Sequence, residues 1–89
     1  MIKTIGKYDF VSMKDDSSYY FISDIFDNTA TIVGMKLSEA RDTIMFFSKK
    51  LPVDELSYVT EYFVNTNGPL AILRENMMHG MNDVYIEEL

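Results

Sequence analysis

The stretch from Leu37 to Leu51 constrains the fold most, because its apolar residues recur at the spacing of an amphipathic helix. At about 100° per residue, one stripe would carry five apolar side chains: Leu37, Ala40, Ile44, Phe47 and Leu51. Ser38 is a favourable N-cap, and Pro52 cannot continue a helix interior. We therefore predict a helix over 37–51 that packs this stripe against the core.

Three strand-forming runs precede this predicted helix. Aromatic and β-branched residues are frequent in Tyr8–Met13, Tyr19–Phe26 and Thr29–Val33. The polar segments between them, Lys14–Ser18 and Asp27–Asn28, suit turns. The pattern predicts a three-stranded antiparallel meander, which needs the helix across one face because so small a sheet is not stable alone.

Two more helices are predicted in the second half of the chain, over Pro52–Val64 and over 69–80, where Pro69 suits the first position and Gly80 the C-cap. The tail over 83–86 is predicted either to add an edge strand to the sheet or to form a frayed terminus. The predicted fold class is therefore α+β: a three-stranded antiparallel meander followed by three short helices, with an optional C-terminal edge strand. The length of 89 residues predicts one domain, residues 1–89.

Composition narrows the range of partners and compartments. Fourteen acidic against eight basic residues give a net charge of −6, which disfavours direct binding to nucleic acid. The same charge suits a partner with a basic or mixed surface, although it is also typical of small proteins that stay soluble. No apolar run approaches the ~20 residues of a membrane span, and the N-terminus lacks the apolar core of a signal peptide. The lack of cysteine fits a reducing compartment, so we expect a cytoplasmic protein without a membrane partner.

The residues needed for common active sites are scarce. One histidine, His79, and no cysteine cannot supply the ligand set of a zinc site, and His79 suits the end of a helix, where a cation is favoured. The chain has no G-x-S-x-G motif, and its four glycines stand singly rather than in a phosphate-binding loop. Adjacent acids such as Asp15 and Asp16 lack the ligand number that a hard cation requires. We expect no catalysis, no cofactor and no bound metal.

Two groups of side chains suggest a protein-binding surface instead. Tyr58 and Tyr62 are four residues apart, opposite the apolar stripe of the predicted second helix, and are interleaved with Asp54 and Glu61. Tyrosine is enriched at binding hot spots, and carboxylates complement a basic partner. Met45 and Phe46 lie outside the stripe of the first predicted helix, so they need either a cover or a partner. Burial of the tyrosines by a neighbouring element remains the alternative.

In general character the chain is short, acidic, free of cysteine and poor in motifs. In this it resembles the small accessory proteins of bacteriophages and mobile elements, many of which bind and block host or defence proteins. The resemblance implies an inhibitor or regulator that covers a surface of a larger, nucleic-acid-handling protein, in the host cytoplasm if a phage encodes it. Two alternatives stay open: a nucleic-acid mimic that uses surface carboxylates, and a structural homo-oligomer such as a homodimer.

Overall fold

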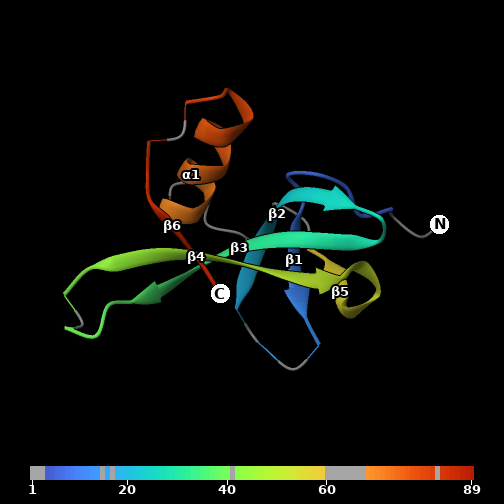
Figure 1. Cartoon of the computed structure of the whole chain (residues 1–89), viewed down its shortest axis with the longest axis horizontal. Helices are drawn as coiled ribbons and strands as arrows, with labels where there is room; N and C mark the ends of the chain where they lie inside the picture. The colour runs from blue at the N-terminus through green and yellow to red at the C-terminus, as the bar shows by residue number, and fades with distance from the viewer. Residues whose placement is uncertain (1–3, 15, 17, 41, 60–67, 82) are drawn as a thin grey trace.

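The computed structural model describes residues 4–14, 16, 18–40, 42–59, 68–81 and 83–89. These residues contain the following elements, in chain order: β1 (Phe10–Met13), β2 (Tyr19–Phe26), β3 (Thr29–Leu37), β4 (Ile44–Pro52), the 3-10 helix η1 (Val53–Glu55), β5 (Leu56–Tyr58), α1 (Pro69–Met78) and β6 (Ile86–Glu88). The strands form one six-stranded sheet of order β5-β1-β2-β3-β4-β6. Among the described strand pairings, only that of β4 with β6 is parallel, and α1 packs on one side of the sheet (Figure 1).

The predicted α+β fold with three helices is therefore wrong, and its main error lies in residues 37–51. This segment forms the end of β3, a loop and β4 instead of a helix. All nine residues of β3 pair with β4, from Thr29 opposite Pro52 to Leu37 opposite Ile44. The third strand thus runs four residues beyond its predicted end at Val33.

Hydrogen bonds between loop residues explain why Ser38 does not start a helix. The Ser38 N–H donates to the carbonyl of Thr43 at 2.9 Å, and the Thr43 hydroxyl donates to the Ser38 Oγ at 3.1 Å. The Ser38 hydroxyl in turn donates to Asp42 at 3.2 Å. Short polar side chains compete with helix formation by such local bonds, and here they close the loop between two strands.

Both faces of the sheet carry an apolar core, which explains why β4 lacks a simple alternation of apolar and polar residues. On one face, α1 covers the first core, made of Phe10, Phe21, Val33, Leu70, Ala71 and Leu73. The opposite face carries the second core, made of Val11, Tyr20, Ile22, Ala30, Ile32 and Leu56. The consecutive residues Phe46 and Phe47 pack against the first and the second core respectively, as the two-residue period of a strand requires.

The chain path shows how the second core is enclosed without a second helix. Only the three residues of η1 separate β4 from β5, yet β5 pairs with β1, three strands away in the sheet order. The sheet must curl to permit this connection. Val53 fixes the turn by donating its N–H to the carbonyl of Asn28 at 2.9 Å, and its side chain packs against the second core.

The other predicted elements have mixed outcomes. The strand over Tyr19–Phe26 is confirmed, and so is a helix that begins at Pro69, with Gly80 just beyond its end at φ +70°. The helix predicted over Pro52–Val64 is wrong for its described part, which forms η1 and β5, and residues 60–64 lie outside the described residues. The predicted edge strand exists but begins at Ile86, and it pairs in parallel with β4.

Gly34 allows two aromatic rings of the second core to lie close to the backbone of β3. A Cβ atom at this position would lie 2.5 Å from Cδ1 of Tyr20 and 2.9 Å from Cζ of Phe47. The two aromatic rings pack edge to face, with centroids 6.1 Å apart. Any side chain larger than hydrogen at this position would push the rings out of this arrangement.

We predict that Gly34→Ala lowers the free energy of unfolding by about 2 kcal/mol, because overpacking in a well-packed core typically has this effect. The measurement is urea denaturation followed by circular dichroism. Gly6→Ala is the matched control, since a Cβ atom at Gly6 would meet its nearest neighbour at an ordinary 3.8 Å. Equal unfolding midpoints for both variants would show that the Gly34 contact does not constrain the fold.

Candidate interaction surface

The distal part of the β3–β4 hairpin projects from the rest of the sheet. We call its described residues, 35–40 and 42–46, the arm. In Figure 1 the arm extends to the left beyond α1, along the 42 Å longest dimension of the molecule. Of the described strands, β2 pairs with β3 only as far as Val33, and β6 pairs with β4 only from Phe46 onward. Beyond these points the arm is a two-stranded ribbon.

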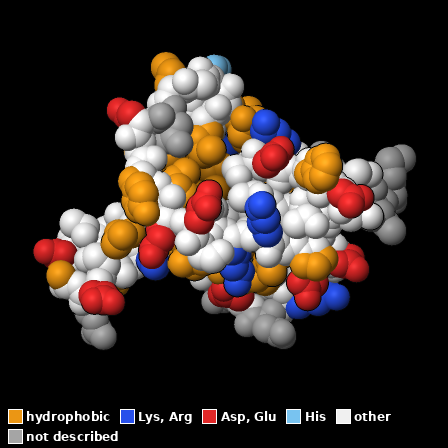
Figure 2. Space-filling view, viewed as in Figure 1, with side chains coloured by type: hydrophobic (Ala, Val, Ile, Leu, Met, Phe, Trp, Pro, Cys, Tyr) orange, Lys and Arg blue, Asp and Glu red, His pale blue; other side chains and the backbone are white. Residues whose placement is uncertain are grey.

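One face of this ribbon is apolar and open to solvent. Leu37 is paired with Ile44, and Met35 is paired with Phe46, so these four side chains lie on the same face. Met35, Leu37 and Ile44 are 41%, 62% and 50% exposed, while Phe46 is half-buried against the first core. We call these four residues the arm face. Hydrophobic side chains and carboxylates are visible together on the arm at the left of Figure 2.

The opposite face of the arm is polar and is connected to the sheet edge. Lys36 is paired with Met45, and its Nζ lies 2.6 Å from a carboxylate oxygen of Glu87 in β6. Both charged side chains are more than one-third exposed, so the ion pair contributes little to stability. The ion pair lies on the face of the sheet opposite the arm face, because Glu87 is opposite Phe47 in the pairing of β4 with β6.

The residues predicted from the sequence to bind protein lie in several parts of the structure. Phe46 belongs to the arm face, whereas Met45 points to the opposite side of β4. Asp54 is exposed in η1, and Tyr58 is 38% exposed in β5, which three strands separate from β4. The remaining two predicted residues, Glu61 and Tyr62, lie outside the described residues.

Sequence reasoning missed three members of the arm face. Leu37 and Ile44 belong to the apolar stripe of the helix predicted over 37–51, and Met35 lies between that helix and the third predicted strand. A signal for them exists: Met35 and Leu37 flank Lys36 with a two-residue period, and a polar loop separates them from Ile44. Alternation on both sides of a short polar segment is typical of a hairpin.

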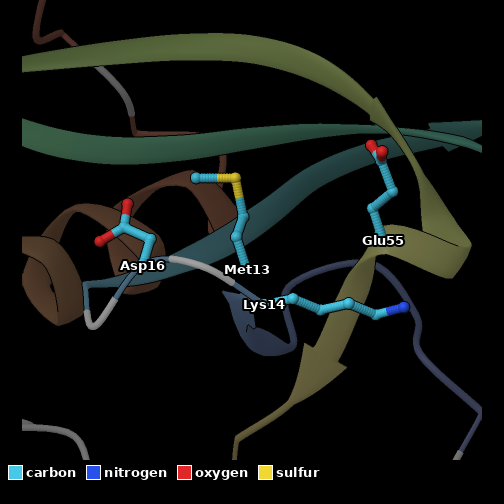
Figure 3. Close-up of a pocket in the computed structure, with 4 residues that line it drawn as sticks. All are labelled: Met13, Lys14, Asp16 and Glu55. Carbon is cyan, nitrogen blue, oxygen red and sulfur yellow. The ribbon is translucent and has the colours of Figure 1, made fainter.

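A pocket of about 310 Å³ lies between the β1–β2 connection and η1 (Figure 3). The Met13 side chain lies between the carboxylates of Asp16 and Glu55, and the Lys14 side chain extends away from the Asp16 carboxylate (Figure 3). Met13 also packs against the second core. The described residues that line the pocket therefore place an apolar thioether side chain between two carboxylates.

Beside this pocket, Asp16 and Tyr20 form a hydrogen-bonded pair in which both pKa values are shifted. The Tyr20 hydroxyl and the Ser18 N–H both donate to the Asp16 carboxylate, and these bonds lower the pKa of Asp16. Burial of Tyr20 and its bond to Asp16 raise the tyrosine pKa to about 12. Since Tyr20 also contacts Phe47, the pair connects the loop to the second core.

Other polar clusters do not suggest a defined ligand. Among the described residues, no group of three or more His, Asp and Glu side chains could hold a metal ion. His79 is the C-cap of α1, and its Nε2 atom lies 3.1 Å from Oε1 of Glu75; both side chains are exposed. A shallow hollow of about 660 Å³ beside the end of β6 is lined by both signs of charge, including Asp24, Lys50 and Glu88. None of the helices in the described part of the chain has the length and apolar character of a membrane span.

The Asp16–Tyr20 bond predicts a pH-dependent stability difference between the natural protein and Tyr20→Phe. The folded-state pKa of Asp16 lies below its usual value, so its stabilising effect is present near neutral pH and is lost as the pH falls through that lowered pKa. Tyr20→Phe should therefore be less stable at about pH 7, and the difference should shrink as the pH falls below the ordinary aspartate pKa of about 3.9. The measurement is the urea midpoint above and below this pKa; a difference independent of pH would contradict the assignment.

Comparison with known proteins assigns no relative to this chain. No model of a protein family matches it, and no curated protein sequence matches it significantly. Function must therefore be inferred from the chain's own surfaces, and the arm face is the one that the described residues define best.

Proposed function

We propose that this protein is a non-catalytic binding module that acts as an inhibitor or regulator by covering a surface of a larger protein. The contact is made by the arm face. By the likeness in size and composition to phage accessory proteins, the partner we propose is a host or defence protein that handles nucleic acid. Such a protein offers the basic or mixed surface that suits a chain of net charge −6.

The single observation that supports this proposal is the exposure of Met35, Leu37 and Ile44 on one face of the ribbon. Scattered apolar residues on a surface are ordinary, but a contiguous set on one face is typical of an interaction site. Complete burial of such a side chain is worth about 1.5–3 kcal/mol. Because each is already partly buried, covering the arm face would contribute roughly 1 kcal/mol per side chain.

The position of the arm supports the same proposal. It projects from the sheet, so a partner can reach the arm face without displacing α1 (Figure 1). The main chain of the arm is held by the β3–β4 pairing and by the hydrogen bonds of Ser38, so little conformational entropy would be lost on binding.

Nucleic-acid mimicry has less support than protein binding through the arm face. A mimic needs an unbroken row of negative charge in place of phosphates. On the face seen in Figure 2, acidic and basic side chains are interspersed instead, and Lys50 lies among Asp24 and Glu88. A homo-oligomer would use the same arm face, so it must be separated by experiment.

We predict that Ile44→Asp abolishes capture of the partner, because it places a charge on the arm face. The measurement is affinity capture from a candidate host lysate, with the bound proteins identified by mass spectrometry. Ile72→Asp is the matched control: Ile72 is 53% exposed on α1, against 50% for Ile44 on the arm. Both changes should shift the free energy of unfolding by no more than about 0.5 kcal/mol.

The proposal predicts that one set of proteins is retained by the natural chain and by Ile72→Asp but is lost with Ile44→Asp. Identical capture by all three proteins would contradict it. Light scattering of the purified chain completes the test, since a dimer that Ile44→Asp dissociates would establish the homo-oligomer instead.

A further inference from the structure

The arm face ends at a strand edge that no described strand covers. The pairing of β2 with β3 begins at Phe21 opposite Val33, and the next residues of β2, Tyr20 and Tyr19, pair with β1 but not with β3. The outer edge of β3 from Met35 to Leu37 therefore has no neighbour among the described strands. The residues at the two ends of this edge, Met35 and Leu37, are two of the three exposed members of the arm face.

The hydrogen-bond pattern of the hairpin shows which main-chain groups face this edge. In antiparallel pairs, residues opposite each other alternate between hydrogen-bonded and non-hydrogen-bonded pairs. The bond from the Ser38 N–H to Thr43 makes that pair hydrogen-bonded, so Lys36 with Met45, two positions further, is hydrogen-bonded as well. Met35 and Leu37 consequently direct their N–H and C=O groups away from β4, toward the open edge.

We infer that the arm binds its partner by strand addition: an extended segment of another protein pairs with the outer edge of β3 from Met35 to Leu37. The N–H and C=O groups of these two residues would form the main-chain hydrogen bonds. Apolar side chains of the added strand would lie beside Met35 and Leu37 on the arm face, as in other complexes where a peptide extends a sheet. This inference rests on the proposed function and specifies how the arm face is used.

Lys36 determines the chemistry of the added strand. It lies between the two edge residues with its side chain on the polar side of the arm, next to Glu87. The residue opposite Lys36 in an added strand should be neutral or acidic, since like charges directly opposite destabilise a pair. The expected segment is therefore apolar–polar–apolar, with no Lys or Arg at its centre.

The same lysine argues against a second copy of this chain as the occupant. Two copies related by a two-fold axis would pair Met35 of each with Leu37 of the other. That register places Lys36 directly opposite Lys36, which is the unfavourable arrangement. A different protein with the stated pattern meets no such repulsion.

The experiment uses peptides selected on the immobilised full chain from a random display library and then synthesised. Amide hydrogen exchange of the free and peptide-bound chain is measured by NMR. In the free chain, the amides of Met35 and Leu37 should exchange rapidly, and peptide should slow both by at least about tenfold. The Lys36 amide is the internal control, because it donates to β4 with or without peptide.

A pair of variants tests the edge separately from the arm face. Leu37→Pro removes one outward N–H group but no hydrogen bond to β4, and proline is tolerated at such edge positions. This substitution should weaken peptide binding by at least about tenfold. Leu37→Val keeps that N–H and should bind within about threefold of the natural chain. The exchange measurement on the natural chain stands even if the proline variant misfolds.

Three results would overturn the inference. The first is the lack of a peptide bound at this edge: either the selection enriches no apolar–polar–apolar peptide, or the Met35 and Leu37 amides stay unprotected in a saturated complex. The second is a dimer of the free chain in which these amides are already protected, since a second copy is then the occupant. The third is full peptide binding by Leu37→Pro. If Ile44→Asp nevertheless abolishes binding, strand addition is wrong but the proposed function stands. If neither substitution weakens binding, strand addition and the proposed function are both wrong.

Discussion

The pairing of β3 with β4 is the interaction on which the rest of this structure depends. It runs without interruption from Thr29–Pro52 to Leu37–Ile44. Near the body of the sheet, the same pairing positions Val33 and Phe46 under α1, and Phe47 against the second core. Further out, it continues past the last contact with β2 and creates the arm. Core packing and a projecting apolar surface are thus two ends of one hairpin.

The second core explains how a chain with a single described α-helix covers both faces of its sheet. The short connection through η1 brings β5 back to β1, and the sheet curls over its own side chains. This curl requires the rings of Tyr20 and Phe47 to approach the backbone at Gly34, where only glycine fits. The bond from Tyr20 to Asp16 then connects the β1–β2 loop to the same core.

Sequence reasoning succeeded where local signals agree and failed where they compete. Strong strand formers located Tyr19–Phe26, and Pro69 with Gly80 located α1. Over residues 37–51 a helical stripe and a strand pattern both fit, and the strand prevailed because Phe46 and Phe47 each find a core on opposite faces. That choice depends on long-range packing, which periodicity does not contain. The same error hid Leu37 and Ile44 from the predicted site, whereas Phe46 was recognised as a residue in need of a partner.

Nuclear Overhauser contacts across the arm in the free protein are the sharpest test of the β3–β4 pairing. Non-hydrogen-bonded antiparallel pairs bring their Cα atoms to about 4.5 Å, close enough for contacts between their α-protons. We expect such contacts between Leu37 and Ile44 and between Met35 and Phe46. Helical contacts between residues three apart over 37–51, or no contact between the two strands beyond Val33, would contradict this pairing, because the arm face would then not exist.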